Sequence, residues 1–183
     1  MRRLIPLGAT GATQNHIHLH AWKQDYTYAA ERAGALRVQA YAEGARSWRV
    51  GAARVHILDW YETHAICLQV DAQAPSDAAS GAREAGQALH RLLQSAAALD
   101  TAVAWNVVFC KERCFIFMRS SEQAPEALPG FSFGCNQMMG YWNVDTAEQF
   151  ETLDAPRIAR ALRQSSHTLA HVEAILRHAA DTE

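Results

Sequence analysis

The sequence predicts an α+β domain in which a mainly antiparallel sheet is flanked by helices. Two observations favour this class. Short apolar runs rich in β-branched or aromatic residues alternate with polar clusters, and longer segments repeat apolar residues at helical spacing. The chain has 183 residues, of which 49% are hydrophobic, and domains average roughly 150 residues. We therefore expect a single domain over residues 1–183.

Six runs have the length and composition of β-strands. Two of them are separated only by Lys111, Glu112 and Arg113, a connection too short for a parallel crossover, which predicts an antiparallel hairpin. The six runs cover residues 16–22, 53–60, 64–70, 104–110, 114–119 and 140–144.

Apolar residues at helical spacing between Ala85 and Ala96 predict the first helix. Ser76 or Asp77 is placed to cap its free amides. A second, short helix is expected to open at Asp145 as N-cap, with Glu148 three positions later in a capping-box pattern.

The C-terminal segment predicts a third helix. Asp154 and then Pro156 stand where an N-cap and a first-turn proline are favoured. Ile158, Leu162 and Ile175 are among the apolar residues that continue the periodic pattern. We expect one amphipathic helix of several turns.

Charge and composition exclude some classes of protein. Seventeen Lys and Arg stand against nineteen Asp and Glu, so no excess positive field would hold a nucleic acid nonspecifically. The apolar part of the N-terminus is shorter than a signal-peptide core, and no run approaches a membrane span. We expect a soluble cytoplasmic protein without a membrane or nucleic-acid partner. The four cysteines fit small buried thiols better than a zinc site.

The stretch "GATQNHIHLHAW" sets His16, His18 and His20 at alternate positions. Alternate residues of a strand share one face, so the three imidazoles point together. Three roles compete for this face: a polar strand face at the rim of the sheet, a divalent-metal site, and nucleophilic catalysis at phosphorus. A closed zinc site would need a fourth ligand, for which the sequence names no obvious residue.

The turn before the histidines favours catalysis at phosphorus. "GATGATQN" is rich in Gly and Thr, which lets backbone amides and a hydroxyl approach an anion closely. A neutral imidazole carries a free lone pair near pH 7, and its phosphoramidate product is reactive enough to be discharged in a second step.

"HIHLHAW" resembles the signature of the histidine-triad superfamily, and "GATQNHIH" is similar to the version found in its transferase branch. The order of "WNVVFCKERCFIFMRS" and "MMGYWNVDTAEQFETLD" also resembles the C-terminal half of diadenosine tetraphosphate phosphorylases and GDP-L-galactose or GDP-glucose phosphorylases. In the motif alone, the chain is similar to galactose-1-phosphate uridylyltransferases. The resemblance implies a histidine-triad-like fold and a nucleotidyltransferase or nucleotide phosphorylase, with a nucleotide or nucleotide-sugar as substrate.

The resemblance also implies roles for individual residues. His18 would be the nucleophile that takes up a nucleoside monophosphate, and His16 would orient it. His20 stands where the transferases usually carry Gln and the hydrolases carry His, which leaves the second acceptor open between phosphate and water. The implied phosphate-binding residues are Thr13, Gln14, Asn15 and Arg119.

Only fifteen residues precede His16, whereas the superfamily places its base and ribose pocket before the triad. The resemblance therefore implies that the N-terminal nucleotide-binding part belongs to a longer chain, that a partner subunit such as a second copy completes it, or that the chain is a reduced module for dimerisation or weak nucleotide binding. A metal-binding protein or a metal-dependent hydrolase is the remaining alternative, and a divalent metal is the one cofactor it would need.

Other residues have structural roles as their first expectation. Trp105, Tyr141 and Trp142 could stack on a base, but aromatic residues in apolar strand contexts usually belong to the core. His167 and His171 are one helical turn apart and could chelate a metal, although an exposed helix face is the favoured role.

Overall fold

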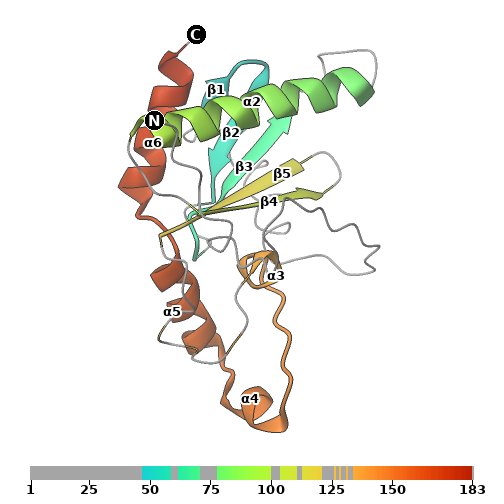
Figure 1. The fold of residues 1–183 in the computed structure, drawn as a ribbon, viewed down its shortest axis with the longest axis vertical. Helices are drawn as coiled ribbons and strands as arrows, with labels where there is room; N and C mark the ends of the chain where they lie inside the picture. Colours follow the sequence, from blue (N-terminus) through green and yellow to red (C-terminus); the bar gives the residue numbers. More distant parts are fainter. Residues whose placement is uncertain are drawn as a thin grey trace.

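The computed structural model describes residues 47–58, 62–70, 78–99, 104–110, 113–120 and 134–182, together with residues 126, 128 and 131. Figure 1 shows a sheet with helices packed against it and a long excursion that carries a small helix away from it. The expected α+β class with an antiparallel sheet is confirmed.

Five strands form the described sheet. In chain order they are β1 (Ser47–Val50), β2 (Ala53–Ile57), β3 (Ile66–Val70), β4 (Ala104–Cys110) and β5 (Arg113–Arg119). Every neighbouring pair is antiparallel, and the order across the sheet is β1-β2-β3-β5-β4. The predicted β4–β5 hairpin is confirmed, and its second strand takes the place beside β3.

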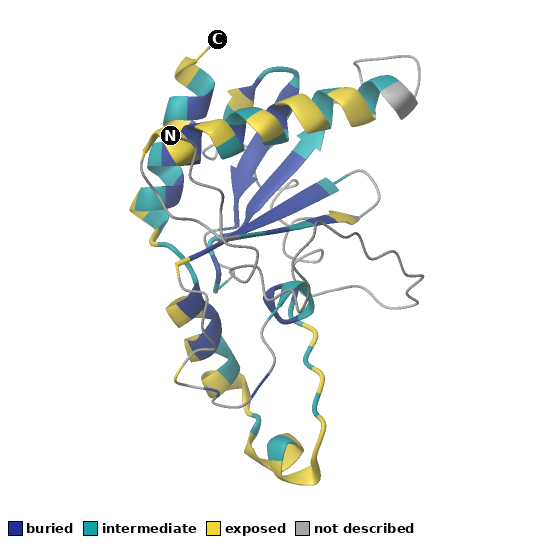
Figure 2. Cartoon of the chain, viewed as in Figure 1, coloured by how far each residue is buried: buried dark blue, intermediate teal, exposed yellow. Residues whose placement is uncertain are grey.

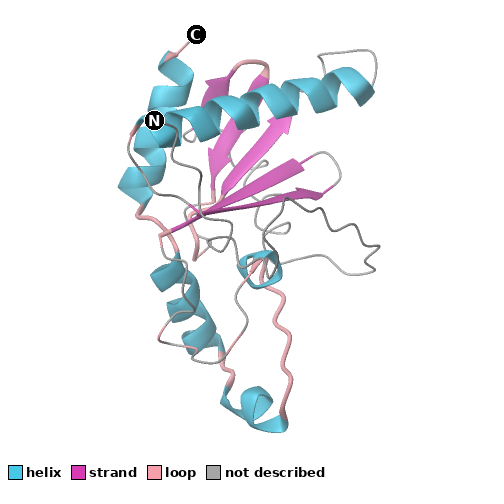
Figure 3. Ribbon diagram, in the orientation of Figure 1, coloured by secondary structure: helices cyan, strands magenta, loops and turns pink. Residues whose placement is uncertain are grey.

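The described helices are α2 (Ala78–Ala98), α3 (Cys135–Met138), α4 (Ala147–Thr152), α5 (Ala155–Ser165) and α6 (Leu169–Asp181). Residues of α2 and α6 share one buried cluster with the strands, whereas residues of α3 and α5 share a second cluster. Alternate residues of β5 divide between the two clusters, because Ile116 belongs to the first and Phe117 to the second. The sheet is therefore covered on both faces, and Figure 3 shows the helices on either side of it.

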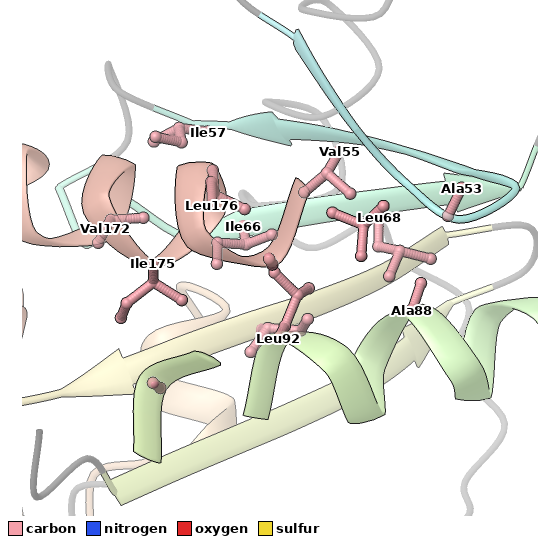
Figure 4. Packing of buried hydrophobic residues seen from close by; sticks show 14 of the residues in the cluster. Ala53, Val55, Ile57, Ile66, Leu68, Ala88, Leu92, Val172, Ile175 and Leu176 are labelled. Atoms are coloured by element: carbon pink, nitrogen blue, oxygen red, sulfur yellow. The ribbon is translucent and has the colours of Figure 1, made fainter. Parts of the chain in front are cut away.

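The larger cluster fills the layer between the sheet and helices α2 and α6. Figure 4 shows Leu92 of α2 and Leu176 of α6 directed toward Ile66 and Leu68 of β3. All four side chains are at most 1% exposed. Burial of such apolar side chains is the main favourable term in folding, about 1.5–3 kcal/mol each. In Figure 2 the strands are mostly dark blue, and exposed residues predominate in α4.

One strand prediction is wrong, and one strand of the structure was not predicted. Residues 140–144 form no strand, because the chain makes a turn after α3 and then runs without sheet pairing to α4. Trp142 of this segment instead packs edge-on against Phe131, with ring centroids 6.4 Å apart. In contrast β1 was not anticipated, since its four residues are too few for a clear alternation.

The C-terminal helix prediction is wrong in one respect. Asp154 does cap α5, and its side chain accepts a hydrogen bond from the amide of Arg157. The chain then leaves the helix at Ser166 and begins α6 after Thr168, which caps it. The interruption has a physical reason: α5 packs on one face of the sheet and α6 on the other, so the chain must pass the end of the sheet between them.

The cap of α4 also lies one residue later than expected. Thr146, not Asp145, is the N-cap, and its hydroxyl accepts from the amide of Gln149. The side chain of Gln149 accepts in turn from the amide of Asp145. The proposed caps of α2, Ser76 and Asp77, lie outside the described residues.

Within the described chain, every helix is too short or too polar to cross a membrane.

Candidate functional site

Most of the residues expected to carry catalysis belong to the segment of residues 13–20. His16, His18, His20, Thr13, Gln14 and Asn15 all lie outside the described residues. The structure does describe Arg119, which is the last residue of β5. The candidate site is therefore built from Arg119 and from the sheet face on which it stands.

The two faces of the sheet differ sharply in chemistry. The face toward α2 and α6 carries only apolar side chains, such as Val55, Leu68 and Ile116. The opposite face, here called the polar face, carries every polar residue of the five strands. By strand alternation, its polar residues are Ser47, Arg49, Arg54, His56, Gln69, Asn106, Arg113 and Arg119.

Arginines are the charged residues of the polar face in the described strands. None of the five strands contains an Asp or a Glu, whereas four arginines lie on this one face. Arginine is the side chain best suited to bind phosphate, because its planar guanidinium offers five donors in a fixed geometry. The charged residues that the five strands contribute to the polar face are thus all arginines.

Three of the arginines share one row across the sheet. Arg49 of β1 pairs with Arg54 of β2, Arg54 pairs with Gln69 of β3, and Gln69 pairs with Arg113 of β5. Arg49 and Arg54 are exposed, and Gln69 and Arg113 are partly buried. This set, here called the arginine row, lies at the end of the sheet where the β1–β2 turn closes.

The next row contains a histidine and a cysteine. His56 pairs with Cys67, and Cys67 pairs with Phe115. Burial raises the pKa of the Cys67 thiol to about 12, against a smaller opposing effect of the positive charge of Arg113. Because only the thiolate is a good nucleophile, Cys67 has a packing role in the core.

Arg119 lies at the opposite end of the polar face and is 1% exposed. Asn106 is opposite Phe117 in the β4–β5 register, so Asn106 and Arg119 are diagonal neighbours on the same face. Both are buried polar residues. A buried guanidinium must be surrounded by acceptors or anions, because leaving it unpaired would cost several kcal/mol.

The backbone at Arg119 is held by the segment between α5 and α6. Arg119 forms an isolated antiparallel bridge with Ser166. The amide of Ser120 donates to the carbonyl of Ser165 at 2.9 Å, and the Ser120 hydroxyl donates to the carbonyl of Gln164 at 3.2 Å. The segment that passes the end of the sheet is therefore fastened to the strand that carries Arg119.

Two histidines stand beside this junction. The rings of His167 and His171 are stacked, with centroids 4.4 Å apart and planes 17° from parallel. Burial lowers the pKa of His167, the charge of His171 lowers it further, and a hydrogen bond with the backbone of Arg119 opposes both. Stacked rings direct their nitrogen lone pairs side by side rather than toward one point. The expected exposed helix face is wrong, because both rings are partly buried and His167 precedes α6.

The remaining sequence hypotheses have mixed outcomes. Trp105 packs against the core on the α2 and α6 face, and Trp142 packs against the core on the polar face. Tyr141 is 40% exposed and is not a core residue. In the part of the chain that the structure describes, no three His, Cys, Asp or Glu side chains are grouped so that they could hold a metal ion.

Sequence reasoning missed Arg49 and Arg54 as candidate site residues. The alternation of Arg54 and His56 with Val55 and Ile57 indicates that the two polar residues share a face. Alternation within one strand does not reveal which residues of other strands join them, because that depends on register.

Comparison of the chain with protein-family models, curated proteins and solved structures gives no match.

Proposed function

We propose that this protein is a nucleotidyltransferase or nucleotide phosphorylase that forms a covalent nucleotidyl intermediate on His18. Its substrate would be a nucleoside diphosphate-sugar or a dinucleoside polyphosphate. The observation that carries the proposal is the sequence motif of residues 11–20, a Gly- and Thr-rich stretch followed by three alternate histidines. Gly- and Thr-rich segments can bring backbone amides close to an anion, and an imidazole is a competent nucleophile at neutral pH.

The chemistry of the sheet supports a phosphate-bearing substrate. Four arginines and no strand carboxylate stand on one face. Phosphoryl and nucleotidyl transfer depend mainly on positioning and on positive groups that offset the charge of the phosphate oxygens. Arg119 remains our candidate for a phosphate contact, and its burial would make that contact strong because water screens it little.

The proposed reaction has two displacements at one phosphorus atom. In the first, a ring nitrogen of His18 forms a bond to the α-phosphorus, and the bond from that phosphorus to the leaving oxygen breaks. In the second, an oxygen of inorganic phosphate or of a sugar phosphate forms a bond to the phosphorus, and the phosphorus–nitrogen bond breaks. Two such steps predict ping-pong kinetics.

Trapping of the intermediate tests the proposal. The chain is incubated with a nucleotide substrate labelled at the α-phosphorus, such as diadenosine tetraphosphate, GDP-glucose or UDP-glucose, and the labelled peptide is identified by mass spectrometry. We expect label on His18 that is lost in mild acid, as a phosphoramidate requires. The His18→Ala variant should take up no label.

A matched control uses a histidine with no proposed role. His90 is exposed on α2, so His90→Ala should be labelled as well as the parent chain. Equal labelling of His18→Ala and the parent would disprove the mechanism. Absence of label from every substrate, with weak nucleotide binding, would favour the non-catalytic module instead.

The residue at position 20 is proposed to select water or phosphate as the acceptor in the second displacement. If His20 favours water as the second acceptor, the parent chain releases a nucleoside monophosphate, and His20→Gln shifts the products toward the phosphorolysis product in the presence of phosphate. Product analysis by chromatography measures this ratio. An unchanged ratio would show that His20 does not select the acceptor.

A further inference from the structure

We infer that Thr63 and His64, in the connection between β2 and β3, bind a phosphate group of the substrate. The chemical class of this ligand rests on the proposed function, whereas the site itself rests on the structure of the turn. Thr63 is 2% exposed, and its hydroxyl has no hydrogen-bond partner among the residues that the structure describes. The Nδ1 atom of His64 is also buried, and it too has no partner in the described part of the chain.

Both residues make the ligand-free turn less stable than it would be with satisfied groups. A hydroxyl loses its hydrogen bonds to water when it is buried, and that free energy is not recovered unless a partner replaces the water. His64 has a φ of 45°, in the left-handed region that residues with a side chain seldom adopt. Backbone strain and unpaired buried groups persist at sites where a ligand compensates for them. Two such features at adjacent residues therefore indicate a ligand site.

The turn lies at the end of the sheet that carries Arg119. Ile66 of β3 is paired with Ile116 of β5 in an antiparallel register, so the residues before Ile66 run toward the end of the sheet at which β5 ends. The amide of Leu58 donates to the carbonyl of Ala65 at 2.7 Å, which continues the pairing of β2 with β3 up to the turn. The turn thus begins directly beyond the paired strands, at the same end as Arg119.

The end of α5 contacts both the turn and the strand that carries Arg119. Glu62, the residue before Thr63, forms an ion pair with Arg163 in the last turn of α5. Ser166, three residues after Arg163, is bridged to Arg119. Three helical residues rise only about 5 Å along the axis. The β2–β3 turn and the backbone of Arg119 are therefore held by the same short segment.

The two side chains have the chemistry to bind a phosphate oxygen. A threonine hydroxyl donates one hydrogen bond, and an imidazole with its proton on Nδ1 donates another. Hydrogen bonds to an anion are roughly twice as strong as those between neutral groups. A bound phosphate would satisfy the Thr63 hydroxyl and the His64 Nδ1 together. It would lie at the same end of the sheet as Arg119, our candidate for a phosphate contact.

Calorimetric titration of the full chain with inorganic phosphate, together with thermal unfolding in the absence of phosphate, tests the inference. Thr63→Val keeps the shape of the side chain and removes the hydroxyl. We expect its phosphate affinity to fall by about tenfold. Its melting temperature without phosphate should rise, because no unpaired hydroxyl stays buried. A higher melting temperature with unchanged affinity would show a packing residue and overturn the inference, as would a parent chain that binds no phosphate.

Thr152→Val is the matched control for this substitution. Thr152 is exposed on α4, and its hydroxyl donates to the carbonyl of Glu148 at 2.9 Å. Because this hydroxyl has a partner, Thr152→Val should not raise the melting temperature, and its phosphate affinity should equal that of the parent. An equal loss of phosphate affinity in Thr152→Val and Thr63→Val would contradict a site at the turn.

Two variants at His64 separate the imidazole from the backbone conformation. His64→Gly removes the ring and adopts a positive φ without strain, so it should also weaken phosphate binding by about tenfold. His64→Asn tolerates the same backbone and places its amide where Nδ1 stands, so it should restore most of the affinity. Parent-like affinity of His64→Gly would overturn the two-residue site, and failure of His64→Asn to restore binding would contradict the role of Nδ1.

Acetate tests the chemical class of the ligand. It should bind at least about tenfold more weakly than phosphate, and equal affinity would overturn the assignment to phosphate. Labelling of His18 separates the two proposals. Label on His18 with unchanged phosphate affinity of Thr63→Val would overturn this inference alone. Phosphate binding that depends on Thr63, in a chain that takes up no label, would leave this site standing and overturn only the proposed reaction.

Discussion

Arg119, the last residue of β5, is bridged to Ser166, the C-cap residue that follows α5. The bridge lies where the chain passes from one face of the sheet to the other. It joins the buried arginine of the polar face to the segment that precedes α6. The position of Arg119 and the packing of the C-terminal helices are thus coupled.

The Ser120–Ser165 contact should account for much of this coupling. Ser120→Pro removes the amide that donates to the Ser165 carbonyl, and we expect a loss of about 1–2 kcal/mol in the free energy of unfolding. Ser120→Ala keeps that amide and loses only the hydroxyl bond to Gln164, so its effect should be about 0.5 kcal/mol or less. Urea denaturation compares the two, and equal losses would exclude the backbone bond as the cause.

Acid should destabilise the fold in part through His167. The pKa of His167 is lower in the folded chain than its ordinary value, chiefly because the ring is partly buried. Above about pH 6.5 the ring is neutral in both states and contributes no pH dependence. As the pH falls below this value the unfolded chain takes up the proton first, so stability decreases.

The variant His167→Gln measures this contribution. Between pH 7 and pH 5, the free energy of unfolding should fall less steeply in His167→Gln than in the parent chain. Gln94→Ala, a change of a non-titrating side chain at an exposed position of α2, should keep the parent slope. If His167→Gln and the parent have the same slope, His167 binds its proton equally in both states.

Cys67 should be inert while the chain is folded. A thiol with a pKa of about 12 is ionised in only about one molecule in ten thousand at pH 8, and Cys67 is also 1% exposed. Alkylation with iodoacetamide, followed by peptide mass spectrometry, should label the partly buried Cys135 faster than Cys67. In denaturant the two should react alike, and equal rates in the folded chain would contradict the burial of Cys67.

Leu92 tests the layer between the sheet and its two long helices. Its side chain is fully buried against the strands, so Leu92→Ala should lower the free energy of unfolding by about 2–5 kcal/mol through lost burial and a residual cavity. Leu99 is 39% exposed just after α2. Leu99→Ala should change stability by about 0.5 kcal/mol or less. Similar losses for both leucines in urea denaturation would contradict the assigned packing.

Local sequence was sufficient to predict the strands, turns and helix caps that depend on a clear pattern of neighbouring residues. The run of residues 104–119 contains two apolar strands and a connection too short for anything except a hairpin, and the structure confirms it. Asp154 caps α5 as its position before Pro156 predicts. Such features depend on a few neighbouring residues, so they can be inferred without the rest of the chain.

Tertiary structure decided the features that depend on which surfaces meet. The periodic pattern from Ile158 to Ile175 is compatible with one helix, and the break at Ser166 follows because its two halves pack on opposite faces of the sheet. Likewise, strand alternation puts Arg54 beside His56 on one face, but only the register brings Arg54 into a row with Arg49 and Arg113. Register and helix placement depend on contacts between distant segments, which local patterns do not specify.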